Sequence, residues 1–287
     1  MGLWSWLFGE PDGVRVKQRS AQRRRFSVHV GINDFAGSPE NALRGCVNDA
    51  RNMHRFCVER GYSAREAVTN KWATKDNLLL LIRGLLHRAE PAGDVLISWS
   101  SHGTRVADPR EADGVVEALV PHDGMLDWPR NLVTAYDLAA LLREAEDVRV
   151  LLVIDACHSG INPADTGLLT RSVANPHNYR KARSLVSGHE AELPAAPRVT
   201  RSIAAPGGEW RRTALLSGAA THETAADAWI DGSYQGALTS ALIAVAKRNP
   251  GASLYDLHRA ALASVAVQYG QTPQLQGPAE LTRAEWL

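Results

Sequence analysis

The sequence predicts an α/β protein built on a largely parallel sheet with helices on its faces. Hydrophobic runs of strand length alternate with amphipathic segments of helical length between residues 26 and 100, in the order β-α-β-α-β. This order favours parallel strands joined by right-handed crossovers. A later run over residues 148–154 is aliphatic or β-branched almost throughout, which is typical of a strand buried on both faces of a sheet.

The first half of the chain divides into elements at recognisable boundaries. A strand is expected over residues 26–32, and a helix over residues 45–60, where Cys46, Met53 and Cys57 share the apolar face. The later elements of this half are a short strand at 64–69, a helix at 78–88 after an N-cap signal, a strand at 94–100, a turn-rich hairpin at 102–130, a helix at 135–146 and the strand at 148–154.

The second half begins with a long segment, residues 158–212, that has no hydrophobic periodicity and is rich in Pro, Ala, Ser and Gly. It is too long for an ordinary connection inside a compact domain, so we interpret it as a loop or a processing linker. Order is expected to return with a strand at 213–219, helices at 237–248 and 253–267, and an edge strand within 271–276, where Pro273 excludes a central position.

Composition limits the classes of function. The formal net charge of +1 gives no reason to expect a nucleic-acid partner. The three cysteines are odd in number and widely spaced, which indicates a reducing compartment, and we expect a cytoplasmic protein. No apolar run reaches the ~18 residues of a membrane span. The apolar start of the chain lacks the basic region of a secretory signal.

Reactive side chains follow two of the expected strands. Asp155 and Cys157 come directly after the 148–154 run, and His102 follows the strand at 94–100. If these strands are parallel neighbours, the thiol and the imidazole leave the same edge of the sheet, where α/β proteins usually build their sites. A nearby imidazole can take the proton of a thiol during attack, so the pattern outlines a cysteine hydrolase. The alternative for Cys157 is a buried core thiol.

Five motifs together resemble the caspase-like cysteine peptidases, and the metacaspases and their bacterial relatives more than the animal caspases. In chain order they are GCVNDA at 45–50, SSHG at 100–103, DACHSG at 155–160, LSGAATHETAADAWIDGSYQGALTSAL at 216–242 and QTPQL at 271–275. The resemblance implies a caspase-like fold, with a six-stranded, mostly parallel sheet flanked by helices. It also implies an N-terminal extension (1–25), a large segment (26–160), a linker (161–212) and a small segment of the same domain (213–287).

The resemblance assigns roles to individual residues. It implies Cys157 as the nucleophile, His102 as the general base and acid, and the backbone N–H groups of Gly103 and Cys157 as the oxyanion hole. Metacaspase-like enzymes cut after Arg or Lys, and the positions that would line the pocket for this residue (S1) are Asp49, Ser100 and Asp155, with Asp227 as a weaker candidate. Two of these acids have a second interpretation. Asp49 is alternatively an acid that stabilises the first turn of its helix, and Asp155 is alternatively the cap of a turn.

The chain departs from the family pattern in two ways. Ala219 stands where the family commonly has a second cysteine, and residues 131–136 lack the paired aspartates of calcium-dependent members. Calcium requires hard oxygen ligands of this kind, so we expect neither calcium dependence nor another cofactor. The alternative is a different calcium site formed by the acids between Asp108 and Asp127. A zinc site from Cys157, His158 and His102 lacks paired-ligand spacing, and His158 is interpreted as structural.

The resemblance and the acids at the pocket positions predict a latent endopeptidase that acts on protein substrates with Arg or Lys before the scissile bond. The resemblance also implies a monomer. The basic residues of the linker are either a solvated surface or sites for autoprocessing or an activating protease. They are Arg171, Arg180, Lys181, Arg183, Arg198, Arg201, Arg211 and Arg212. Two alternatives are a caspase-fold module that binds peptides without cutting them and an Asp-specific caspase. Acids at the pocket positions oppose the second.

Overall fold

A seven-stranded sheet forms the centre of the molecule. The computed structural model describes residues 23–64, 66–111, 114–145, 147–156, 169–170, 211–219 and 225–287. The strands run in the order β13 (Gln274–Gln276), β10 (Thr213–Ser217), β8 (Arg149–Asp155), β4 (Asp94–Ser100), β1 (Arg25–Gly31) and β2 (Ser63–Ala64), with β3 (Val68–Thr69) also on β1. All pairs are parallel except β10 with β13. Because β2 and β3 share one edge, the sheet has six positions, which confirms the predicted fold class.

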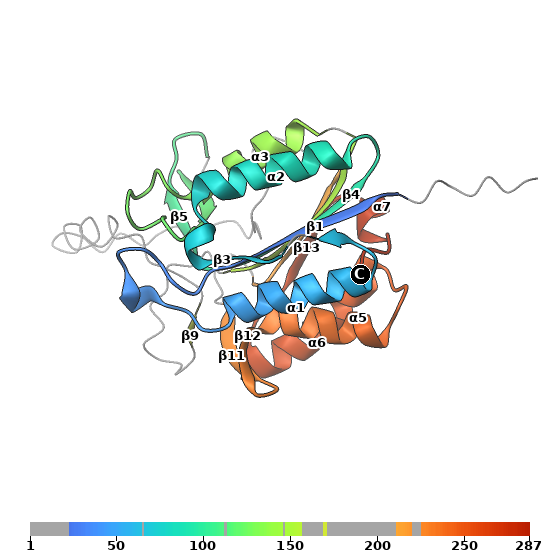
Figure 1. The fold of residues 1–287 in the computed structure, drawn as a ribbon. Helices are drawn as coiled ribbons and strands as arrows, with labels where there is room; N and C mark the ends of the chain where they lie inside the picture. Colours follow the sequence, from blue (N-terminus) through green and yellow to red (C-terminus); the bar gives the residue numbers. More distant parts are fainter. Residues whose placement is uncertain are drawn as a thin grey trace, which may run out of the picture.

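Helices cover both faces of this sheet. On one face lie α2 (Lys75–Ala89) and α3 (Ala135–Arg143), and on the other lie α1 (Cys46–Glu59), α5 (Ala237–Arg248) and α6 (Leu254–Tyr269) (Figure 1). Alternate residues of β8 enter the two cores: Val150, Leu152 and Ile154 enter one, and Leu151 and Val153 the other. Burial on both faces explains why the sequence of this strand is an unbroken apolar run.

The start of α1 lies against the end of β1. A Cβ atom on Gly31 would lie 2.2 Å from the carbonyl oxygen of Cys46, so only glycine allows the helix to begin so close to the strand. Cys46, Met53 and Cys57 are fully buried, which confirms the predicted apolar face of this helix. Gly61, at φ 78°, follows the helix, as expected.

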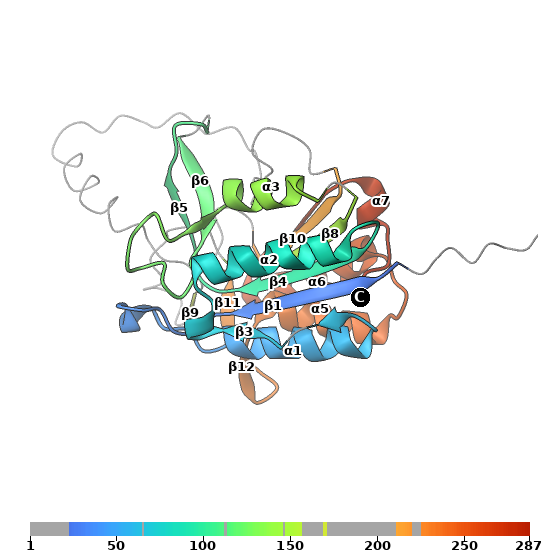
Figure 2. The same cartoon turned by 45° about the horizontal axis from the view of Figure 1, so that its top comes forward.

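Two small antiparallel sheets stand at the end of the central sheet where its parallel strands finish (Figure 2). One contains β5 (Gly103–Ala107), β6 (Val115–Leu119) and β7 (Val133–Thr134), and confirms the predicted hairpin. The other contains β9 (Leu169–Thr170), β11 (Ala226–Ile230) and β12 (Ser233–Gly236). The β11–β12 hairpin was not predicted, although Asp231-Gly232, both at positive φ, is a strong hairpin-turn signal.

The remaining differences from the sequence prediction concern the ends of elements, one divided strand and three short helices. The short strand at 64–69 is two separate two-residue strands, α3 ends at Arg143, and β10 ends at Ser217. Three short helices were not predicted: η1 (Pro39–Asn41), η2 (Asn70–Trp72) and α7 (Ala279–Thr282).

Caps at two helix starts differ in kind. The hydroxyl of Ser253 accepts from the amide of Asp256 at the start of α6, as expected. At the start of α2 the Thr74 side chain makes no cap, and Asp123 instead accepts from the amide of Lys75. Within the described ranges, no helix is long and apolar enough to cross a bilayer. Most of the 158–212 segment lies outside the described residues.

Candidate active site

The two strands that precede the predicted dyad are parallel neighbours. β4 pairs with β8 along its whole length, and Ser100 is the register partner of Asp155. His102 and Cys157 each follow two residues after this last pair. The pairing therefore brings the two chain segments to one edge of the sheet, as the sequence predicts. Cys157 and His158 themselves lie outside the described residues.

The imidazole of His102 is buried and held from two sides. Its Nε2 lies 2.7 Å from the carbonyl oxygen of Asn41, and the ring of Phe35 packs against it with centroids 4.9 Å apart. A carbonyl oxygen can only accept, so Nε2 carries the proton of the neutral ring and Nδ1 is the basic nitrogen. This tautomer is the one in which Nδ1 can remove a proton from a thiol.

The turn that supplies the Asn41 carbonyl is held by side chains of its own. The Ser38 hydroxyl donates to the Glu40 carboxylate, and the side-chain nitrogen (Nδ2) of Asn41 donates to the Ser38 hydroxyl at 2.6 Å. The hydrogen bond from Ser38 holds the pKa of the Glu40 carboxyl below its usual value. These contacts fix the geometry of residues 38–41, and therefore the direction of the carbonyl that orients His102.

Asp155 is 1% exposed and is bound to the start of α5. Its Oδ2 accepts from the backbone amide of Thr239 at 2.9 Å and from the Thr239 hydroxyl at 2.8 Å. The N-cap position of α5 is Gly236, which has no side chain to cap the helix. Asp155 takes over this capping function from the neighbouring strand.

Asp49 and Asp227 are also buried and form two contacts that cross between α1 and the β11–β12 hairpin. Oδ1 of Asp49 accepts from the amide of Gly236 at 2.8 Å. Oδ2 of Asp227 accepts from the amides of Arg44 and Gly45, at 2.8 and 3.2 Å. Each carboxylate therefore lies at the N-terminal end of a helix, where the helix dipole favours negative charge.

The predicted pocket residues come together around residues 236–239. Asp49 contacts Gly236, Asp155 contacts Thr239, and Asp227 is the register partner of Gly236 in the hairpin. Ser100, buried beside Asp155, completes the set. The buried carboxylates of Asp49 and Asp155 therefore both lie at the start of α5, and their negative charge favours a cation nearby.

The side chain of Gln271 bridges the end of β10 and the start of β11. Its side-chain oxygen accepts from the amide of Ala226, and its nitrogen donates to the carbonyl of Gly218, both at 3.0 Å. It is fully buried, so this pair of bonds ties the end of β10 to the start of β11. The structural role of Gln271 explains why a polar residue stands at this position of the QTPQL motif.

Several residues that hold the predicted site residues in place have little or no signal in the sequence. The Asn41 carbonyl carries no sequence signal, because any residue has one. The contact of Thr239 with Asp155 can be predicted only when the position of α5 relative to β8 is known. Gly45 and Gly236 were visible as glycines just before helices, which favours them as N-caps without a side-chain cap.

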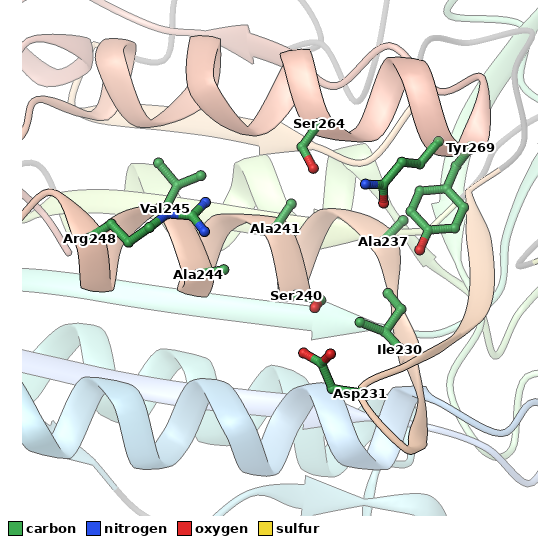
Figure 3. Close-up of a pocket in the computed structure, with 11 residues that line it drawn as sticks. Ile230, Asp231, Ala237, Ser240, Ala241, Ala244, Val245, Arg248, Ser264 and Tyr269 are labelled. Atoms are coloured by element: carbon green, nitrogen blue, oxygen red, sulfur yellow. The ribbon is translucent and has the colours of Figure 1, made fainter.

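A separate surface cavity of about 160 Å³ lies between α5 and α6 (Figure 3). The turn between β11 and β12 borders one end with Asp231, and Arg248 lies toward the far end of α5. None of the predicted site residues lines it. In the described part of the chain, no three His, Cys, Asp or Glu side chains form a group that could hold a metal ion.

Comparison with known proteins identifies the family to which this chain belongs. The caspase-domain family profile matches residues 24–282. Metacaspase-1 of Ajellomyces capsulatus is 27% identical over 305 residues, covering 93% of this chain and 83% of the relative. Metacaspase-1B of Aspergillus clavatus is 29% identical over 301 residues, covering 93% and 72%.

Solved structures show the same fold. A crystal structure of a Geobacter sulfurreducens protein aligns with a TM-score of 0.64 at 22% identity, covering 91% of this chain and 97% of that one. Caspase-1 from Spodoptera frugiperda aligns with a TM-score of 0.57 at 10% identity, covering 89% and 87%. With the family match spanning nearly the whole chain, this protein belongs to the caspase-domain family and is a cysteine-type peptidase.

Proposed function

We propose that this protein is an endopeptidase that cuts after Arg or Lys through a His102–Cys157 dyad. The observation that carries the proposal is the arrangement at the paired ends of β4 and β8. There, the buried carboxylates of Asp155, at the end of β8, and of Asp49 both bind residues 236–239, beside the two strand ends from which the imidazole and the thiol follow. A basic substrate side chain in this environment places the scissile carbonyl near the nucleophile.

The proposed chemistry has two stages. Nδ1 of His102 takes the thiol proton as the sulfur of Cys157 attacks the carbonyl carbon, and the N–H groups of Gly103 and Cys157 stabilise the oxyanion. His102 then gives its proton to the leaving amine, which leaves an acyl-enzyme. Water, deprotonated by the same nitrogen, attacks this acyl group and releases the acid and the free thiol. The Asn41 carbonyl supports the cycle because it keeps the ring oriented and stabilises the imidazolium.

We also propose that the protein is made latent and is activated when the 161–212 linker is cut, or by a partner. The support is the basic composition of the linker, which would itself be a substrate for an enzyme that cuts after Arg or Lys. The further elements of the proposal are a cytoplasmic location, a monomeric state and activity without calcium.

The first experiment is hydrolysis of matched fluorogenic peptides with Arg, Lys or Asp before the reporter, with and without calcium, by wild type and Cys157→Ala. We expect turnover of the Arg and Lys peptides only, unchanged by calcium and absent in the mutant. Preference for the Asp peptide would overturn the pocket assignment. If no peptide is cut, trimming the linker with a trace of another protease separates a latent enzyme from a module that only binds peptides.

The acidic pocket is tested by Asp49→Asn, with Asp231→Asn on the exposed β11–β12 turn as the matched control. The asparagine at position 49 keeps an acceptor for the Gly236 amide but removes the charge. We expect kcat/KM for Arg peptides to fall roughly 30-fold or more, because a buried charge partner is lost. The control should match wild type, and equal activity in both variants would exclude Asp49 from charge recognition.

A further inference from the structure

We propose that Asp227 is a positioning residue that sets the place of Asp49, and that it does not contact the basic side chain of the substrate. The proposal rests on the proposed function in one respect, the role of Asp49 in charge recognition. Its structural basis is the junction between α1 and the β11–β12 hairpin, where β12 lies beside the start of the helix (Figures 1 and 2).

The Asp227 carboxylate is directed toward the backbone at the start of α1. Oδ2 accepts from the amides of Arg44 and Gly45, and Oδ1 lies against Gly45, where an added Cβ atom would be only 2.1 Å away. Gly45 is the N-cap of α1 and provides no side-chain cap. Asp227 thus acts on the backbone at the start of α1, as an acceptor supplied by another part of the chain.

The backbone of the β11–β12 hairpin lies close against the start of α1. A Cβ atom at Gly45 would also lie 2.8 Å from the amide nitrogen and 2.9 Å from the Cα atom of Gln235. The hairpin backbone therefore contacts the helix start directly. A substrate side chain entering between Asp227 and Gly45 would have to displace backbone atoms, which argues against Asp227 as a wall of the pocket.

Asp227 is connected to Asp49 through Gly236. Asp227 and Gly236 are register partners in the hairpin, and Gly236 donates to Asp49 in the first turn of α1. Two contacts therefore cross the junction in opposite directions within a few residues of each other. Asn48 adds a bond from its side chain to the carbonyl of Tyr234 at 2.9 Å. When the Asp227 contact is lost, the helix start is free to shift, and Asp49 moves with it.

The test compares Asp227→Ala with Asp227→Asn. Asparagine keeps an oxygen that accepts from Arg44 and Gly45 but has no charge. For a positioning residue, we expect Asp227→Ala to lower kcat/KM for Arg peptides roughly tenfold or more, chiefly through KM, and Asp227→Asn to stay within about threefold of wild type. If Asp227 contacts the substrate cation, the asparagine variant loses as much activity as the alanine variant, and the proposal is wrong. Asp231→Asn is the control for a change in the same hairpin.

Hydrogen exchange gives a readout that does not need activity. In Asp227→Ala we expect the amides of Arg44 and Gly45 to exchange roughly tenfold faster or more, and the amide of Gly236 to follow because Asp49 has moved. Asp227→Asn should protect all three. Faster exchange at Arg44 and Gly45 with unchanged protection of Gly236 would overturn the coupling to Asp49. If wild type fails to cut Arg peptides, the proposed specificity fails, but the exchange result still decides the role of Asp227.

Discussion

Oδ2 of Asp155 accepts two hydrogen bonds from a single residue, Thr239, through its backbone amide and its hydroxyl. One carboxylate at the end of β8 is thereby oriented by the first turn of α5, and the same contact caps that helix. Cys157 follows Asp155 by two residues. The Thr239 contact therefore orients a predicted pocket residue and the strand end that leads to the proposed nucleophile.

This relationship makes Thr239→Val an informative variant. Valine has the same shape as threonine, but it removes the hydroxyl donor and keeps the amide. We expect a loss of about 1 kcal/mol in the free energy of unfolding, and roughly tenfold lower kcat/KM for Arg peptides, because Asp155 is less firmly oriented. Peptide kinetics and urea unfolding measure the two effects. Thr239→Ser keeps the hydroxyl and should retain activity, and a valine variant with full activity would show that the contact only stabilises the helix.

Phe35 packs on the His102 ring, and Phe35→Leu should impair the orientation of that ring. We expect kcat to fall roughly tenfold with KM nearly unchanged, because in the proposed mechanism the imidazole acts in the chemical step, and the substitution leaves the proposed pocket acids in place. Steady-state kinetics with an Arg peptide checks the separation of kcat from KM.

Phe56→Leu is the matched control for this prediction. Phe56 is as deeply buried, but it belongs to the core on the other face of the sheet. Both variants should lose about 1–2 kcal/mol of stability from the cavity they create, and only Phe35→Leu should lower kcat. If kcat falls equally in both variants, the loss of activity comes from general destabilisation and not from the orientation of the His102 ring.

The sequence was a good guide where one element carries its own signal. The buried run of β8, the apolar face of α1 and the Pro273 edge strand were all found, because apolar periodicity and special backbone residues are local. The adjacency of the two strand ends that precede His102 and Cys157 also followed, since it needs only that β4 and β8 be parallel neighbours.

The rest of the site depends on contacts between distant parts of the chain. The Asn41 carbonyl reaches His102 across 61 positions, and Thr239 reaches Asp155 across 84. Neither contact leaves a pattern in the sequence around either partner. The same holds for Asp227, which the resemblance gave as a weaker candidate for the S1 pocket. Its carboxylate accepts from the backbone amides of Arg44 and Gly45, and no local pattern in the sequence indicates this contact.

The cysteines should differ sharply in reactivity. Cys46 and Cys57 are fully buried, and burial raises the pKa of the Cys57 thiol to about 12, so at neutral pH it stays protonated and unreactive. We expect iodoacetamide to modify Cys157 alone in the native protein, and all three thiols in denaturant. Mass spectrometry of labelled peptides identifies the site, and native Cys157→Ala is the control that should take up no label. Labelling of Cys57 in the native protein would contradict this picture.

His29 makes the stability of the fold sensitive to acid. Burial, with a smaller contribution from His54, lowers the pKa of His29 to about 3, and its two ring nitrogens lie 2.9 Å from the hydroxyls of Ser27 and Ser98. The folded state therefore keeps the ring neutral, whereas the unfolded chain binds a proton below about pH 6.5. The full stabilisation is present above that pH and is lost progressively as the pH falls toward 3.

This linkage predicts a loss of about 2 kcal/mol in the free energy of unfolding between about pH 6.5 and pH 5, from His29 alone. Urea unfolding at several pH values, for wild type and His29→Gln, isolates the contribution, because glutamine does not titrate and keeps polar atoms near Ser27 and Ser98. The variant should be less stable than wild type at neutral pH, since its fit is poorer. The difference should shrink as the pH falls, because only the wild-type chain gains a proton on unfolding. A difference that stays constant over this range would mean that His29 takes up its proton in the folded state as readily as in the unfolded one.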